Sequence, residues 1–262
     1  TAGGNMVVET RTKSSVQADA VAEASGVFGT NANAQADARI GTHDFGDTNY
    51  ASEESAVSRT TIGENAKLVA ENLTIGAYVD KMRSHAFAKT YAISAGGNSD
   101  PTARSYAAGI DEVQLFDDLL LNDAASDFPG PELTGYESIL IEAQTNNVSI
   151  TSRADGETDA VGGDTDVVSK VRLDNRAKVE GYWEALLTTA QLEVKAVQNS
   201  PVGQATSRRD GAWVDGGGTT CNDTNNAHRE IFWESHVILL GEPNPELVID
   251  ENGTIIELTN IE

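Results

Sequence analysis

Apolar and polar residues alternate with a period of two along most of the chain, which is the pattern of β-strands that turn one face inward. The inward positions in 14–26 and 31–41 are Val16, Ala18, Ala20, Ala22 and Ala24, then Ala32, Ala34, Ala36, Ala38 and Ile40. In the later stretch KLVAENLTIGAYV, the same rule places Leu68, Leu73 and Ile75 inward. The pattern predicts an all-β protein with a thin core of small and β-branched side chains.

One of two further segments leaves an alternative open. In 103–125, Val113, Phe116, Leu119 and Leu120 have helical spacing, which fits either a short helix or a loop. In 137–156, the sequence ESILIEAQTNNVSITSRADG predicts two short strands joined at Asn146-Asn147, because Asn tolerates the backbone of a tight turn.

A weak internal repeat relates residues 56–77 to residues 167–196. Val57 aligns with Val168 and Ile62 with Leu173, at an offset of 111 residues (56 to 167). Beyond these, ENLTIGA (71–77) aligns with AQLEVKA (190–196) at an offset of 119 (71 to 190). The eight additional residues fall in YWEALLTT (182–189), which predicts a loop insertion between strands that keep their register.

These patterns predict a single elongated parallel β-solenoid over residues 1–262. At roughly 20–30 residues per winding it would have about ten coils, with insertions in the loops. One coil cannot bury its own inward side chains, so the coils above and below must cover them. The alternative is an antiparallel β-sandwich, which requires frequent hairpin turns and a core with more aromatic residues.

The alternating runs VQADAVAEASG and ANAQADARIG, with IGENAKLVAENLTIGA and ILIEAQTNNVSITSRADG, resemble the repetitive regions of giant bacterial surface and secreted proteins. The resemblance is to adhesins of the filamentous-haemagglutinin type. It implies a right-handed parallel β-helix that serves as a surface rod, adhesin or extracellular filament. It implies no catalytic residues.

Composition restricts the partners. With 41 acidic and 18 basic residues the net charge is −23, which argues against nucleic acid and against a bare anionic membrane. No apolar run reaches the roughly 18 residues of a membrane span, so membrane insertion is not expected. Cys221 is the single cysteine. The start TAGGNMVVET has no signal-peptide pattern, and we interpret the chain as a processed product or a segment of a longer polypeptide.

One acidic segment is a candidate calcium site. In RADGETDAVGGDTDVV, alternating carboxylates and glycines resemble a calcium loop, although the order matches neither an EF-hand nor a calcium β-roll. The candidate ligands are Asp155, Glu157, Asp159, Asp164 and Asp166. The alternative is a solvated acidic loop.

A second acidic segment suggests an enzyme. LFDDLLLNDAASD holds Asp117, Asp118, Asn122, Asp123 and Asp127, and paired carboxylates cleave glycosidic bonds when their pKa values differ. Surface glycans are also candidate ligands for three tryptophans, Trp183, Trp213 and Trp233. The histidines form no zinc-binding pair, and no serine nucleophile motif is present.

The sequence therefore predicts a non-enzymatic structural protein outside the cell, at or near its surface. It would be a subunit or repeat segment of a filament or adhesin that associates with copies or neighbouring repeats through the ends of its solenoid. Two alternatives remain: a polysaccharide lyase or hydrolase on a β-helix, and a calcium-stabilised surface-layer protein.

Overall fold

The computed structural model describes residues 3–41, 56–115, 130–160, 162–182, 185–199, 202–211, 215–216, 219–233 and 235–240. Within these ranges the chain forms β-strands and no helix. Every pairing between these strands is parallel. The prediction of an all-β protein with parallel strands is confirmed, and the antiparallel sandwich is wrong.

The strands form two sheets of seven strands each. Sheet A consists of β1 (Asn5–Ser25), β4 (Lys67–Ser94), β6 (Glu132–Thr145), β7 (Val148–Ala160), β10 (Leu186–Gln198), β11 (Val202–Gly211) and β14 (His236–Leu239). Sheet B consists of β2 (Asn31–Ile40), β3 (Ala56–Ile62), β5 (Asn98–Leu115), β8 (Gly163–Asp164), β9 (Val167–Gly181), β12 (Asp215–Gly216) and β13 (Thr219–Trp233).

The chain crosses sheet A and then sheet B, and each return to a sheet lies beside the previous strand of that sheet. We call one such circuit a pass. The first pass contains β1, β2 and β3, the second β4 and β5, the third β6 to β9, and the fourth β10 to β13. β14 then pairs with β10.

A pass is much longer than the sequence suggests. Partners in neighbouring strands lie between 50 and 68 positions apart, from Leu186 with His236 to Lys13 with Lys81. The prediction of about ten coils with 20–30 residues each is therefore wrong. The physical reason is strand length, because β4 alone has 28 residues and extends for about 90 Å.

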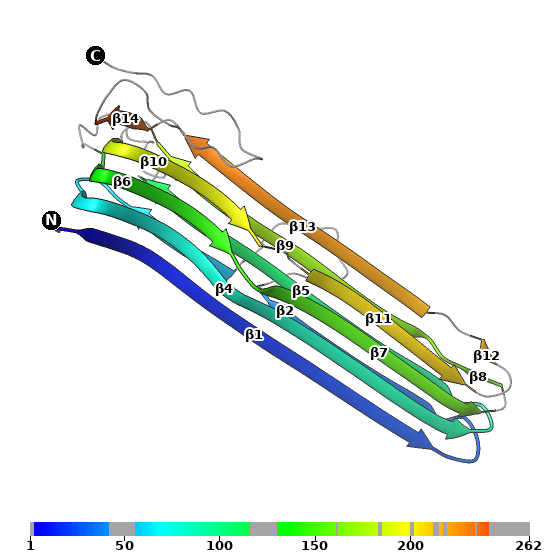
Figure 1. Ribbon diagram of the computed structural model, residues 1–262. Coiled ribbons are helices and arrows are strands. Elements are labelled where there is room, and N and C mark those ends of the chain that lie inside the picture. The colour runs from blue at the N-terminus through cyan, green and yellow to red at the C-terminus, as the bar shows by residue number, and fades with distance from the viewer. Residues whose placement is uncertain are drawn as a thin grey trace, which may run out of the picture.

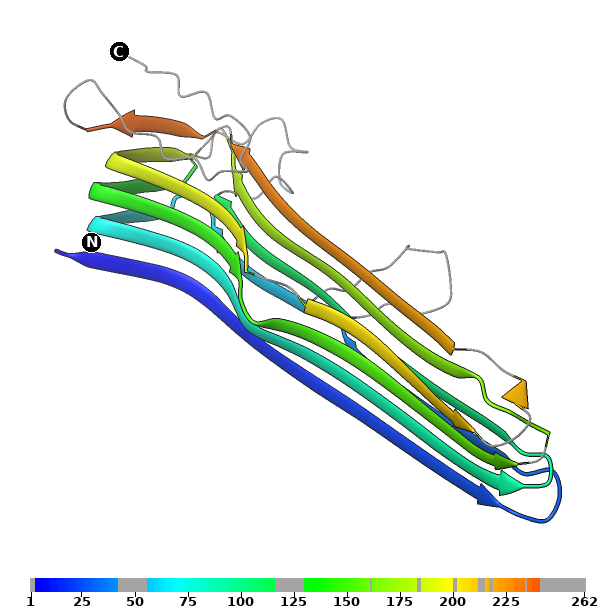
Figure 2. The same cartoon turned by 45° about the vertical axis from the view of Figure 1, so that its right-hand side comes forward.

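The described part is elongated along its strands. In Figure 1, β1, β4, β6 with β7, and β10 with β11 lie side by side in one layer. The strands of sheet B form the second layer and run in the opposite direction (Figure 1). Figure 2 shows β1 at one edge of the stack and the strands of the fourth pass toward the other.

The predicted alternation of faces is confirmed. In β2, every even-numbered residue from Ala32 to Ile40 is buried, and the intervening residues are mostly exposed. Leu73 and Ile75 are also buried, as expected from their spacing. In β1 the inward residues are only half-buried, and no described strand lies along the other edge of β1.

Three clusters fill the space between the sheets. The aliphatic cluster contains Ile62, Leu73, Ile75, Val113, Leu115, Leu133, Ile139, Ile141, Val179, Leu187, Leu192 and Val194, with alanines between them. The alanine cluster contains Ala34, Ala36, Ala38, Ala86, Ala88, Ala103, Ala154 and Val167. The middle cluster contains Ile40, Val79, Met82, Ala107, Val148, Ile150, Val171 and Leu173. The two ends of the strands therefore have different cores.

The described parts of 103–125 and 137–156 are strands. The described part of 103–125 lies in β5, so the helical alternative is wrong for residues 103–115, and 116–125 lie outside the described residues. The prediction of two strands joined at Asn146-Asn147 is confirmed, and this junction does not reverse the chain. β6 and β7 continue along the same neighbour, because both pair with β4.

The register also relates the two repeat segments. Leu73 lies beside Ile139, which lies beside Leu192. The offset of 119 residues (73 to 192) therefore relates residues at the same level of β4 and β10, two strands apart in sheet A. The offset of 111 residues does not match the strand pairing of sheet B. Val57 lies beside Ile110, which lies beside Arg176 rather than Val168.

Candidate functional site

The five candidate calcium ligands do not form one cluster. Asp155, Glu157 and Asp159 lie in β7 of sheet A, and Asp164 and Asp166 lie in or just after β8 of sheet B. Their side chains alternate with buried neighbours, so each set faces away from the interior on its own sheet. Among the described residues, no three His, Cys, Asp or Glu side chains come close enough together to hold a metal ion.

Two of these carboxylates bind other side chains instead. Arg153 Nη2 lies 2.6 Å from Asp155 Oδ2. This contact raises the pKa of the Arg153 guanidinium through its hydrogen bond and charge. The Tyr91 hydroxyl donates to Asp159 Oδ2 at 2.9 Å from the neighbouring strand. These pairs are part of the outer face of sheet A.

Several other candidates lie outside the described residues. They are Asp117, Asp118, Asn122, Asp123, Asp127, Trp183 and Trp213. Trp233 lies in β13, where it is partly buried and packs against the aliphatic cluster. His85 in β4 contacts Thr151 of the neighbouring strand, with 2.8 Å between Nδ1 and Oγ1.

Sheet A bends at the same position along the strands in every pass. The register of β1 with β4 shifts between Thr12 and Lys13, which leaves Asp80 of β4 without a partner in β1. At the same level, β6 gives way to β7 and β10 gives way to β11. Figure 2 shows the strands of sheet A changing direction here. A bulge of one residue increases local twist and bends a strand, which explains the change.

Asparagines join the passes along this bend. The Asn147 amide donates to the Asp80 carbonyl oxygen at 3.1 Å, and the Asn199 amide donates to Asn146 Oδ1 at 2.6 Å. Asn147 has a φ of 50°, a conformation that Asn tolerates better than most residues. The asparagine pair that the sequence marks as a turn therefore forms the bend.

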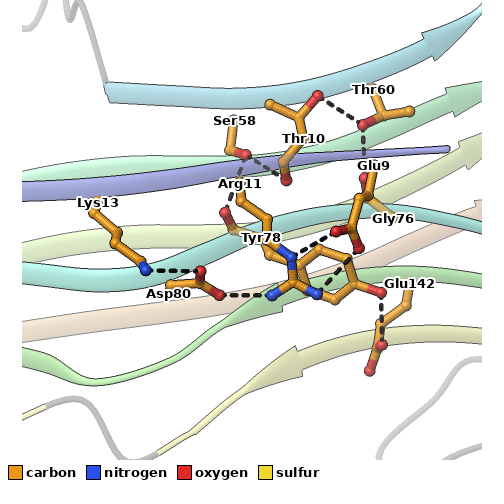
Figure 3. Close-up of polar contacts among 10 residues, drawn as sticks. All are labelled: Glu9, Thr10, Arg11, Lys13, Ser58, Thr60, Gly76, Tyr78, Asp80 and Glu142. Carbon is orange, nitrogen blue, oxygen red and sulfur yellow. Dashed lines mark hydrogen bonds and ion pairs between the residues drawn. The ribbon is translucent and has the colours of Figure 1, made fainter. Parts of the chain in front are cut away.

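Arg11 covers the outer side of the bend (Figure 3). Its Nε donates to Glu9 Oε1 at 2.7 Å, and its Nη1 donates to Asp80 Oδ1 at 2.9 Å. The guanidinium carbon lies 4.4 Å from the centroid of the Tyr78 ring, which is a cation–π distance. Lys13 adds a longer ion pair of 3.7 Å to Asp80. Arg11 thus connects β1 to the residue that the bulge displaces.

Tyr78 lies flat along the sheet beneath Arg11. A side chain at Gly76 would collide with the Tyr78 ring, so only glycine leaves room for this position. The Tyr78 hydroxyl donates to Glu142 Oε2 at 3.2 Å. Burial, followed by the charge of Glu142, raises the pKa of Tyr78 to about 12. The phenol therefore remains protonated and keeps its donor at physiological pH.

Hydroxyl groups of β3 hold the inner side of the bend (Figure 3). Ser58 Oγ donates to the Tyr78 carbonyl oxygen at 3.2 Å, and Thr60 Oγ1 donates to the Gly76 carbonyl oxygen at 2.6 Å. Both hydroxyls are buried, so each bond satisfies a polar group that would otherwise be costly between the sheets. Sheet B is thereby joined to sheet A at the bend.

One ionisable side chain lies in the interior beside the bend. Asp111 of β5 is fully buried, and its Oδ2 accepts a hydrogen bond from the Thr145 hydroxyl. Thr145 in turn accepts a bond of 2.6 Å from the Asn175 amide. Asp111 Oδ1 has no hydrogen-bond partner within the described part of the molecule. Burial raises the pKa of Asp111 to about 7, because it removes solvent from the carboxylate and no side chain described here supplies a compensating positive charge.

The first pass has a free edge. In the described part of the chain, β1 pairs with β4 alone, and β2 pairs with β5 alone. We call the sides of β1 and β2 that face away from these partners the first-pass edge. An unpaired strand edge presents a row of backbone donors and acceptors to any further strand.

The hydrogen bonds show which residues present that row. The Gly26 N–H donates to the Ile93 carbonyl at 3.0 Å, and the Asn98 N–H donates to the Thr30 carbonyl at 2.9 Å. Successive residues of a strand direct their backbone groups to opposite sides. The even-numbered residues near the end of β1 and in β2 therefore face their partners, and the odd-numbered residues face the free edge. The same odd-numbered residues carry the outward side chains.

Comparison with known protein families, curated proteins and solved structures gives no match for this chain. Among the described residues, no helix is long and apolar enough to cross a membrane. Among the described strands, the first-pass edge has unused backbone donors and acceptors, and so do the outer edges of β11 and β13, which pair only with β7 and β9. The Arg11–Tyr78 network at the bend is engaged in its own contacts.

Proposed function

We propose that the chain winds as a parallel β-solenoid and serves as a structural segment of an extracellular surface filament or adhesin. The observation that carries this proposal is a parallel hydrogen-bond ladder that runs through four passes to β1. β1 has 21 residues, and its other edge pairs with no strand among the described residues. Crossovers between parallel strands are right-handed in about 98% of cases, so we propose right-handed winding.

The shape of the interior supports a structural role. Successive passes place small or branched side chains in the same columns, such as Leu73, Ile139 and Leu192. Each column is completed by the pass beside it, so the passes stabilise one another. An array of this kind gives an extended, regular surface rather than a concave site for a substrate.

The charge supports association at the edge rather than on the faces. With a net charge of −23 and outward residues such as Glu9, Asp19 and Glu23, two outer faces of sheet A repel each other. Backbone pairing at an edge does not require close contact between these faces. Copies of the chain or neighbouring repeats are the proposed partners, and surface glycans are a further candidate ligand.

Negative-stain electron microscopy over a range of protein and salt concentrations tests the proposal. We expect uniform fibres or rods whose diffraction includes a spacing of about 4.8 Å between strands. Added salt should promote their formation, because it screens repulsion between acidic copies. Single particles under every condition would contradict self-association, and release of reducing ends from acidic polysaccharides would contradict a non-enzymatic role.

A further inference from the structure

The first-pass edge has a geometry that selects one kind of partner. We propose that it binds the last pass of a second copy of this chain, with the strands parallel and in the register that the stack already uses. This inference rests on the proposed function and adds the orientation and register of the contact. β11 of the second copy would lie beside the second half of β1, and β13 would lie beside β2.

The register of the existing stack fixes the residues that would meet. Gln17 lies beside His85, His85 beside Thr151, and Thr151 beside Gln204. Continuing the stack by one strand places Gln204 of the second copy beside Gln17. Within one copy the same two residues are three strand spacings apart, or about 14 Å.

In the second half of β1 the inward columns continue with small side chains. In this register Val16 would meet Gly203, and Ala18 would meet Ala205. Ala18 is half-buried, while Ala86 beside it in β4 is fully buried. A further strand would therefore bury the inward row of β1 as β1 buries that of β4.

The two different ends of the interior exclude the opposite orientation. A two-fold contact between two first-pass edges would place β1 antiparallel to its copy. Met6, which packs on the aliphatic cluster, would then lie near the alanine cluster of the other chain. The bend of one sheet A would also run against that of the other. Parallel addition matches both features and leaves a new free edge, so it predicts open growth rather than a closed dimer.

Disulfide crosslinking tests the register directly. In a Cys221→Ser background, Gln17→Cys combined with Gln204→Cys should form disulfide-linked oligomers under mild oxidation. Neighbouring strands bring the two Cα atoms within the usual range for a disulfide, whereas the pair inside one copy is too distant. The matched control combines Val21→Cys with Gln204→Cys, which is displaced by four residues and should crosslink at least tenfold less.

A second pair of variants tests the edge itself. Val21→Pro removes an N–H that faces the free edge, and Ala20→Pro removes one that faces β4. Val21→Pro should abolish fibres in sedimentation and microscopy without a change in the strand content of the dissociated chain by circular dichroism. Ala20→Pro should instead lower the temperature of unfolding.

The outcomes separate this inference from the proposed function. If fibres form but neither the cysteine pair nor Val21→Pro behaves as expected, the contact is wrong and the structural role stands. Crosslinking through a single Ser15→Cys at the centre of β1 would indicate the antiparallel two-fold contact and overturn the inference. Absence of any assembly in the parent chain would instead contradict the proposed function itself.

Discussion

The two ends of the interior are held together in different ways. At one end, large side chains such as Leu73 and Ile141 fill the space between the sheets. At the other end, sheet A alanines such as Ala88 and Ala154 cluster with sheet B alanines such as Ala36, and these side chains bury far less apolar area per residue. The same alternating pattern therefore supports two kinds of core.

Short polar side chains supplement the alanine end. Thr90 and Ser99 join the sheets through hydroxyls 2.6 Å apart, and Ser84 and Ser105 do so at 2.7 Å. Such short side chains can touch only if the backbones are closer than the roughly 10 Å of ordinary stacked sheets. The comparison teaches that hydrogen bonds set the distance between the two sheets at the alanine end, where little apolar area is buried. At the aliphatic end, side-chain volume sets that distance.

The largest expected effect is at the aliphatic end. Ile141 is fully buried in β6, so Ile141→Ala should lower the free energy of unfolding by about 2–5 kcal/mol through a cavity. Chemical denaturation of the dissociated chain measures the change. Val7→Ala, on the outer face of β1, is the control and should have little effect. Equal losses for the two variants would contradict a core that depends on volume at this end.

Asp111 lies where the two ends meet, and its effect depends on pH. The native pKa of about 7 exceeds the ordinary value of 3.8, so the native state binds the proton more tightly than the unfolded state. This contribution to stability is complete below about pH 4 and is lost as the pH rises to about 7. Asn cannot ionise, so Asp111→Asn should remove this loss of stability at high pH. The variant should be more stable than the parent by up to about 4 kcal/mol at pH 8.

Denaturation of the parent and the Asp111→Asn variant between pH 4.5 and pH 8 measures this difference. Asp19→Asn on the outer face makes the same change in net charge and serves as the control. A difference between parent and Asp111→Asn that does not vary with pH would show that Asp111 does not carry its proton in the interior.

A smaller loss is expected when the alanine end is overfilled. Ala88 is fully buried, and Ala88→Leu should force the sheets apart at a cost of about 1–3 kcal/mol. The corresponding change at Ala70, which lies in the aliphatic cluster, is the comparison variant. Unfolding measurements that show Ala88→Leu to be neutral would mean that the sheets are not closely spaced at this end.

The smallest effect concerns the hydroxyl pair of Thr90 and Ser99. Thr90→Val leaves a buried serine hydroxyl without its partner and should cost about 1–2 kcal/mol. Adding Ser99→Ala removes the second hydroxyl, so the double variant should recover part of the loss. A double-mutant cycle by denaturation measures the coupling, and additive losses would show that the pair does not bridge the sheets.

The inward faces were predictable, because they depend only on local alternation. Ala32 to Ile40 and Leu73 to Ile75 have the burial that their spacing predicts. The parallel arrangement was also predictable from the repeated columns and the scarcity of hairpin turns. Both features depend on residues that are close in sequence or that recur in register.

The length of a pass was not predictable, because alternation does not mark where a strand ends. Asn146-Asn147 has the composition of a turn, but the neighbouring strand β4 keeps β6 and β7 in line. Similarly, Val113 fits a helical spacing, although its pairing in β5 places it in a strand. Tertiary pairing decided both cases over local preference.

The network at the bend had no signal in the sequence. Arg11, Tyr78 and Asp80 meet only because a register of 67 residues brings Arg11 beside Tyr78. If the register were known, the Gly76-Ala77-Tyr78 sequence would indicate that the Tyr78 ring lies over Gly76. The acidic residues from Asp155 to Asp166 looked like one site because they are close in sequence, but a change of sheet separates them.

The length of the central strand has a mechanical consequence. β4 has 28 residues and pairs with β1 along one edge and with β6 and β7 along the other. A force applied along its axis would load both ladders in shear, so many hydrogen bonds would resist together. A force applied across the stack would peel one strand at a time and break those bonds in succession. The molecule should therefore be much harder to rupture when it is pulled lengthwise.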